Sequence, residues 1–88
     1  MKDSKWIGFD STIHGVHVRI AVSHVTMAFE WQIQPNAANM QVAKEKACKL
    51  AEIATTKAGA RSGEHWEVFI EGELASARRH VQPAAPDA

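Results

Sequence analysis

Five histidines give this chain its clearest potential for proton transfer or metal binding, and three of them, His14, His17 and His24, lie in its first half. A metal site needs three or four ligands that converge on one point. On an extended strand, His14 and His17 point to opposite faces, so we expect surface histidines and neither a metal site nor a cofactor. Strand pairing could nevertheless bring His17 and His65 together on an open sheet face.

The other reactive side chains lack the neighbours that catalysis needs. Cys48, the single cysteine, lies in the middle of an expected helix with Lys44 as the nearest cation. A nucleophilic thiol needs a nearby base or a helix N-terminus. The glutamates near the last expected strand alternate outward and should be solvated: Glu64, Glu67, Glu71 and Glu73. The sequence contains no glycine-rich phosphate loop, and we predict no enzyme activity.

The charge balance argues against a nucleic-acid-binding protein. The chain has ten basic and ten acidic residues, so its formal net charge is zero. Nucleic-acid-binding proteins usually have a basic excess, because phosphate neutralisation supplies most of their affinity. The most concentrated cationic sequence is Arg78-Arg79, followed by His80. Nucleic-acid binding through Arg78, Arg79 and an open sheet face is therefore kept as the alternative, but it is not favoured.

Length and composition predict one small globular domain. With 88 residues and 45 % hydrophobic content, the chain can form one core with a thin stability margin, which dimerisation often remedies. One cysteine excludes an internal disulfide and fits a cytoplasmic protein. No apolar run approaches the roughly 20 residues that span a bilayer. The start of the sequence lacks the apolar segment of a signal peptide, so we expect no membrane partner.

Alternating apolar residues predict the strands. Residues 13–22 alternate Val and Ile with polar or small side chains, and residues 65–72 alternate again, as in strands with one buried face. Residues 6–9 should form a short edge strand, followed by a turn at 10–12.

One long helix is expected between these strands. Asn36 or Asn39 can cap its start, and Gly59 is a typical residue after its end at Ala58. Its apolar stripe is mostly alanine, which lets a helix lie close to a sheet. The pattern predicts an α+β fold, a small β-β-α-β open-faced sandwich with one long helix packed on a three- to four-stranded sheet.

Residues 24–34 allow two interpretations. Apolar side chains alternate from Val25 to Ile33, which favours a strand that pairs with residues 16–22 and places His17 opposite Glu30. Alternatively, Ser23 caps a helix that starts here. We favour the strand.

The domain is expected to span residues 6–74. Residues 1–5 should be frayed, and residues 75–88 should form a flexible tail that ends in a Pro/Ala-rich sequence. One or two helical turns could still form within 73–80.

Residues 9–27, FDSTIHGVHVRIAVSHVTM, resemble a small bacterial family catalogued as domain of unknown function 1488. The positions that fit its pattern are Phe9, Ile13, Gly15, Val18, Ala21, Val22, Ser23 and Met27. The later order of a helix ending in KAG, a loop and a strand is also similar, so the resemblance covers most of residues 6–72. It implies a helical turn after Ser23, and it implies no activity because the family's function is unknown.

The sequence therefore predicts a non-catalytic protein-interaction module that acts as a homodimer or binds another protein. Phe69 lies on the expected open face between two glutamates, where an apolar side chain can contact a partner or the N-terminal segment. An unpaired edge strand could also pair across a two-fold axis. The candidate binding residues are His17, Arg19, Glu30, His65, Phe69, Arg78 and Arg79.

Overall fold

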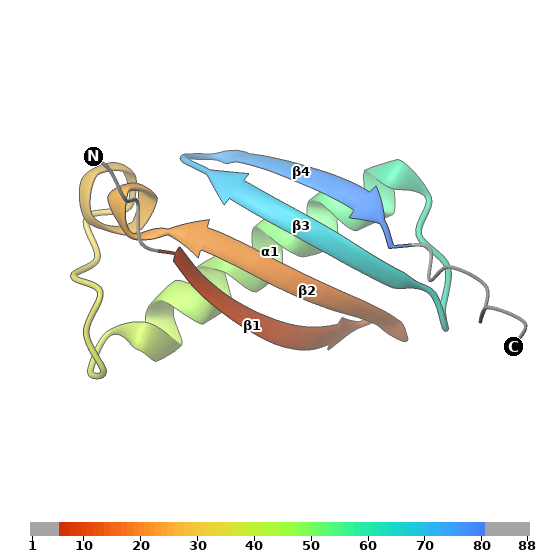
Figure 1. Ribbon diagram of the computed structural model, residues 1–88, viewed down its shortest axis with the longest axis horizontal. Helices are drawn as coiled ribbons and strands as arrows, with labels where there is room; N and C mark the ends of the chain where they lie inside the picture. The colour runs from red at the N-terminus through yellow and green to blue at the C-terminus, as the bar shows by residue number, and fades with distance from the viewer. Residues whose placement is uncertain (1–5, 81–88) are drawn as a thin grey trace, which may run out of the picture.

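The computed structural model describes residues 6–80, which form a twisted sheet with one helix lying against it (Figure 1). In chain order the elements are β1 (Trp6–Ile13), β2 (Val16–Ser23), the short π-helix η1 (Thr26–Glu30), α1 (Met40–Ala58), β3 (His65–Glu71) and β4 (Leu74–Arg79). The four strands have the order β1-β2-β3-β4. The central pair, β2 and β3, is parallel, and the outer pairs are antiparallel.

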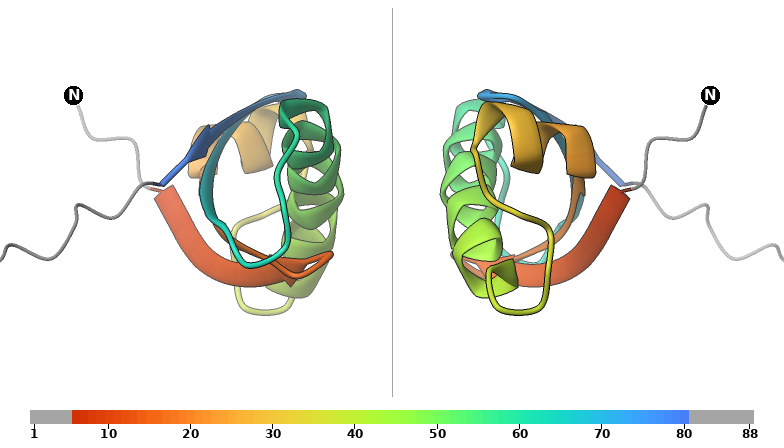
Figure 2. Two further views of the ribbon diagram at one scale, coloured as in Figure 1. Left: turned by 90° about the vertical axis from the view of Figure 1, so that its right-hand side faces the viewer. Right: turned by 90° about the vertical axis from the view of Figure 1, so that its left-hand side faces the viewer.

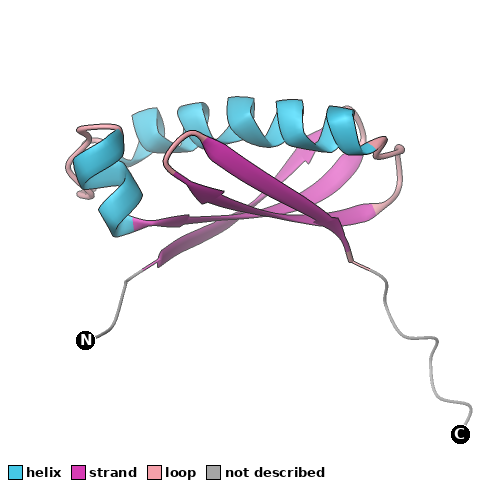
Figure 3. Cartoon of the chain, turned by 90° about the horizontal axis from the view of Figure 1, so that it is seen from above, coloured by secondary structure: helices cyan, strands magenta, loops and turns pink. Residues whose placement is uncertain are grey.

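The helix α1 covers one face of the sheet and, among residues 6–80, no element covers the other face (Figures 2 and 3). The predicted open-faced α+β architecture is therefore confirmed. The order of the regular elements is β-β-α-β-β, because β1 precedes β2 and a fourth strand, β4, follows β3.

The core lies between the sheet and α1. The central strands contribute their alternate side chains to it, and α1 contributes three fully buried alanines, Ala43, Ala47 and Ala51. Their spacing of four residues places them on one stripe of the helix, and their small size lets α1 approach the sheet closely. Ile20 and Ile70 are also fully buried, and truncation of such a side chain to alanine typically costs about 2–5 kcal/mol.

A tight turn at His14-Gly15 joins β1 to β2. Both residues have positive φ, 50° and 81°, as a two-residue type I′ hairpin requires. Ile13 and Val16 form the last pair of the two strands. The turn predicted at residues 10–12 is therefore wrong, since these residues continue β1 and the chain reverses later.

The strand predicted over residues 24–34 is also wrong, and the helical alternative after Ser23 is the one found. Ser23 Oγ accepts a hydrogen bond from the Thr26 backbone N–H at 3.1 Å. Thr26 Oγ1 accepts one from the Gly72 N–H at 3.1 Å, and the indole N–H of Trp31 donates to the Gly72 carbonyl at 2.8 Å. These bonds fix η1 against the β3–β4 turn. Since β1 and β3 occupy both edges of β2, no edge remains for another strand.

Residues 74–79 form β4, so the helical turns predicted within 73–80 are wrong. Gly72, with φ of 62°, starts the two-residue turn before β4, and Ala75 and Ala77 pack against the core. Residues 75–79 of the predicted flexible tail therefore belong to the sheet. The predicted frayed segment, 1–5, and residues 81–88 lie outside the described residues. No helix within residues 6–80 is long and apolar enough to cross a membrane.

Candidate functional site

The open face of the sheet presents its side chains in rows that run across the four strands, since every second residue of a strand points to the same face. One row, the charged row, consists of Asp10, Arg19, Glu67 and Arg78, taken in order from β1 to β4. Its charges alternate in sign from one strand to the next. Arg19 Nη1 lies 3.4 Å from Asp10 Oδ1, and Arg78 Nη2 lies 3.1 Å from Glu67 Oε1. Within one chain, the row is therefore electrically balanced.

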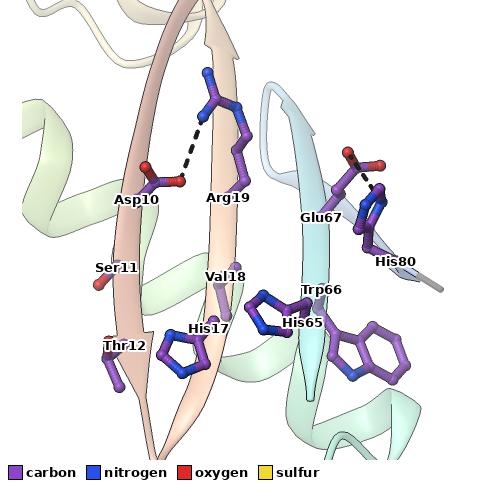
Figure 4. A pocket seen from close by; sticks show the side chains of 10 residues that line it. All are labelled: Asp10, Ser11, Thr12, His17, Val18, Arg19, His65, Trp66, Glu67 and His80. Atoms are coloured by element: carbon purple, nitrogen blue, oxygen red, sulfur yellow. Dashed lines mark hydrogen bonds and ion pairs between the residues drawn. The ribbon is translucent and has the colours of Figure 1, made fainter. Parts of the chain in front are cut away.

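The neighbouring row, the histidine row, consists of Thr12, His17, His65 and His80. The rings of His17 and His65 are stacked, with centroids 4.7 Å apart and planes inclined by 14°. In Figure 4 the His65 ring lies between β2 and β3, and the His17 ring lies on the β1 side of β2. His80 Nδ1 lies 3.8 Å from Glu67 Oε2. The expected meeting of His17 and His65 on the open face is thus confirmed.

The opposite end of the open face, the apolar end, holds three large apolar side chains, and Glu71 and Ser76 are exposed beside them. Phe69 lies beside Ala21 in the β2–β3 register and is 44 % exposed. Trp6 and Leu74 lie on the two edge strands and are 45 % and 77 % exposed. The large Phe69 side chain therefore lies next to the small Ala21 side chain on the central strands.

A hollow of about 570 Å³ lies over the polar end of the face. Side chains of both rows line it: Asp10, Thr12, His17, Arg19, His65, Glu67 and His80. The hollow is open to solvent along the sheet, and Figure 4 shows its side chains rising from β1, β2, β3 and the end of β4.

Most of the candidate residues chosen from the sequence lie on this face: His17, Arg19, His65, Phe69 and Arg78. Glu30 does not, because it belongs to η1 and lies near Gly72. Arg79 follows Arg78 directly and points to the other side of β4, where its Nε lies 3.6 Å from Glu64 Oε2. The placement of Glu30 opposite His17 is therefore wrong.

Sequence reasoning missed Asp10, Thr12, Leu74 and His80 as residues of the open face. Asp10 and Thr12 were assigned to a turn on the strength of their turn-forming composition. The alternation of Ile7, Phe9 and Ile13 with polar residues was the signal that these residues extend a strand. For β4, the alternating alanines gave only a weak signal.

Glu64 directly precedes β3 and is, among the described residues, the carboxyl group whose surroundings clearly alter its acidity. The Trp66 indole N–H donates to Glu64 Oε1 at 3.0 Å, and the Arg61 backbone N–H donates to the same oxygen at 2.9 Å. These bonds, with the positive charges of Arg79 and Arg61, hold the Glu64 pKa below its ordinary value. A general acid needs the opposite shift, so Glu64 has a structural role.

Within residues 6–80 of one chain, no group of three His, Cys, Asp or Glu side chains is placed to hold a metal ion. Cys48 Sγ lies 3.7 Å from Ser11 Oγ, a neutral hydroxyl that does not activate a thiol. The exposed rows are suited to contacts with another surface. A scan against protein-family models and searches of curated proteins and of solved structures found no match to the chain, so the geometry alone supports a function.

Proposed function

We propose that the protein is a non-catalytic protein-interaction module that forms a homodimer through its open sheet face. The observation that supports this is the alternating sign of the charged row. Consider a two-fold axis that is parallel to the strands and lies between β2 and β3. It places β2 of one copy over β3 of the other, and β1 over β4. Arg19 then faces Glu67 of the second copy, and Asp10 faces Arg78, so every facing pair has opposite charges.

The apolar end of the face is complementary under the same axis. Phe69 faces the small side chain of Ala21 in the second copy, and Trp6 at one edge faces Leu74 at the other. Each large side chain therefore meets a small or apolar one. Exposed aromatic side chains that become buried in this way are the usual anchors of protein interfaces.

An axis that crosses the strands does not give this match. If the axis runs along the charged row, each strand lies over the same strand of the second copy. Asp10 then faces Asp10 and Arg19 faces Arg19, and like charges in contact are costly. Of these two axes, the charge pattern favours the one along the strands, which is compatible with the aligned face-to-face packing of twisted sheets.

The size of the face predicts a dimer of moderate affinity. Strands about 4.8 Å apart and about 20 Å long make a four-stranded face of roughly 400 Å² before side-chain relief is counted. The total area that two such faces bury is at or below the lower end of the range for specific interfaces, which is roughly 1,200–2,000 Å². We therefore expect a dissociation constant in the micromolar range and a mass that depends on concentration.

Nucleic-acid binding is the weaker candidate. Arg78 and Arg79 each lie within ion-pair distance of a glutamate, Glu67 and Glu64 respectively. Phosphate would have to displace these pairs, and acidic side chains on the same face would repel it. The single free cysteine supports a cytoplasmic setting for the dimer.

Phe69→Glu tests the proposed interface, with Ile53→Glu as its control. Phe69 is 44 % exposed on the open face, and Ile53 is 58 % exposed on α1, so both variants should fold. Light scattering after size exclusion should give wild type and Ile53→Glu masses approaching twice 9.7 kDa with increasing concentration. The mass of Phe69→Glu should stay at one chain. Equal dimerisation of all three proteins would refute the proposal, and a 260/280 nm ratio typical of nucleic acid would favour the alternative.

A further inference from the structure

The histidine row gives the proposed dimer a metal site that neither copy has alone. We propose that the dimer binds one Zn²⁺ on its two-fold axis through His17 and His65 of both copies. This inference rests on the proposed function, because the same axis that matches the charged row also places His17 over His65 of the second copy.

Within one copy, two of the four ligands are already side by side. The His17 and His65 rings are stacked with their centroids 4.7 Å apart and their planes inclined by only 14°, so the two rings are neighbours on the open face. Both residues are exposed. Zn²⁺ binds imidazole nitrogens at about 2.0–2.1 Å, which places the nitrogens of a tetrahedral site about 3.4 Å apart. Nearly parallel rings have nearly parallel nitrogen lone pairs, so both side chains must turn about χ1 and χ2 for the nitrogens to converge on one ion. Because both side chains are exposed, they can turn without a change in the backbone.

The second copy is needed to complete the site. No group of three possible ligands is close enough within residues 6–80 of one chain. Packed sheets lie about 10 Å apart, and half of this gap, about 5 Å, is roughly the reach of a histidine Nε2 from its own backbone. Imidazoles from both sheets therefore meet near the middle of the interface. The axis passes between β2 and β3, the strands that hold His17 and His65.

The neighbouring side chains suit zinc-bound imidazoles. Zinc-bound histidines usually donate their second ring N–H to a carboxylate or another acceptor. The Thr12 hydroxyl lies opposite His17 in the β1–β2 register, and Glu67 lies two residues from His65 on the same face. Four imidazoles fill the tetrahedral shell and leave no position for a substrate, so the ion would tighten the dimer without supplying catalysis.

The test uses the full chain without a histidine tag. Calorimetric titration with zinc chloride should give one ion per two chains. In sedimentation equilibrium, the dissociation constant of the dimer should be about 100-fold lower with zinc than in EDTA. This holds when the free Zn²⁺ concentration is about 100 times the dissociation constant of the zinc site. His17→Gln and His65→Gln should bind no ion, and the dimer dissociation constant of each variant should be the same in zinc as in EDTA. His14→Gln should retain both effects, because His14 lies in the β1–β2 turn and bonds to Glu52.

The possible failures of the two proposals differ. A dimer that forms equally in zinc and in EDTA and binds no ion would overturn the zinc site and leave the proposed function standing. One ion per chain, or binding that persists in His17→Gln, would also overturn the shared site. A monomer at all concentrations, with and without zinc, would overturn both proposals.

Discussion

Arg19→Glu and Glu67→Arg should each prevent dimerisation alone and restore it when mixed. In the proposed dimer, Arg19 of each copy faces Glu67 of the other. Arg19→Glu therefore creates two glutamate–glutamate contacts, and Glu67→Arg creates two contacts between arginines. A mixture of the two variants forms a heterodimer in which every facing pair again has opposite charges.

The size of the effect follows from the symmetry. Two unit charges 4 Å apart interact by about 1 kcal/mol in water, so turning attraction into repulsion costs about 2 kcal/mol per contact. The two-fold axis repeats the contact, and screening at physiological salt reduces the total of about 4 kcal/mol by roughly half. The remaining ~2 kcal/mol weakens each homodimer about 30-fold. Within one chain, Arg19→Glu removes the exposed Arg19–Asp10 pair, which contributes at most about 1 kcal/mol. It also places a third carboxylate between Asp10 and Glu67, so the stability of this variant must be measured beside its mass.

Sedimentation velocity on each variant, and on their equimolar mixture, measures the outcome. Each variant alone should sediment as a monomer at concentrations where the wild type is dimeric, and the mixture should recover the dimer. Thermal melts followed by circular dichroism would show that both variants fold. Two variants that dimerise alone as the wild type does, or a mixture that stays monomeric, would refute the proposed axis.

Two further predictions concern stability. Gly15→Ala should destabilise the fold by about 1–3 kcal/mol in urea unfolding, because Gly15 has φ of 81° and a Cβ there would clash with the Ser62 side chain. Gly59→Ala has the same φ and open space, so it should cost less, and equal losses would contradict the predicted clash. Glu64→Gln should destabilise the protein at pH 7, because the lowered Glu64 pKa stabilises the fold above the ordinary value of 4.5. That loss should shrink as the pH falls below about 4.5, and an unchanged difference at pH 3 would contradict the assignment.

The elements with strong local patterns could be predicted from the sequence. In β2, valine and isoleucine alternate with polar or small residues, and α1 combines an alanine stripe with Gly59 in the left-handed conformation after its end. These features depend on side chains that are close in sequence. The parallel pairing of β2 and β3 joins segments on either side of α1, so its register could not be predicted, although the meeting of His17 and His65 was expected.

The segment after Ser23 shows why the remaining elements could not be predicted. Its alternation from Val25 to Ile33 fits a strand, but its conformation depends on distant partners. The Gly72 N–H and carbonyl bond to Thr26 and Trp31, and β1 and β3 leave β2 without a free edge. The fourth strand was missed for a related reason. Its inward residues, Ala75 and Ala77, are too small to give a strong hydrophobic signal.

The charged row was only partly visible in the sequence. Arg19 and Arg78 were candidates, but Asp10 was assigned to a turn, and the pairing of Glu67 with Arg78 needed a fourth strand. The alternation of sign across the sheet is therefore a property of the register between strands. It is also the observation on which the proposed dimer depends.

In the proposed dimer, the open face is the surface on which the two copies meet. A dilution series of ¹⁵N–¹H correlation spectra tests it most directly, because it reports association and its location together. The proposed dimer should give concentration-dependent shifts in the micromolar range that gather on β2 and β3, at Arg19, Glu67 and Phe69, with none on the outer face of α1. Spectra that do not change with concentration, or shifts that gather on α1, would contradict it.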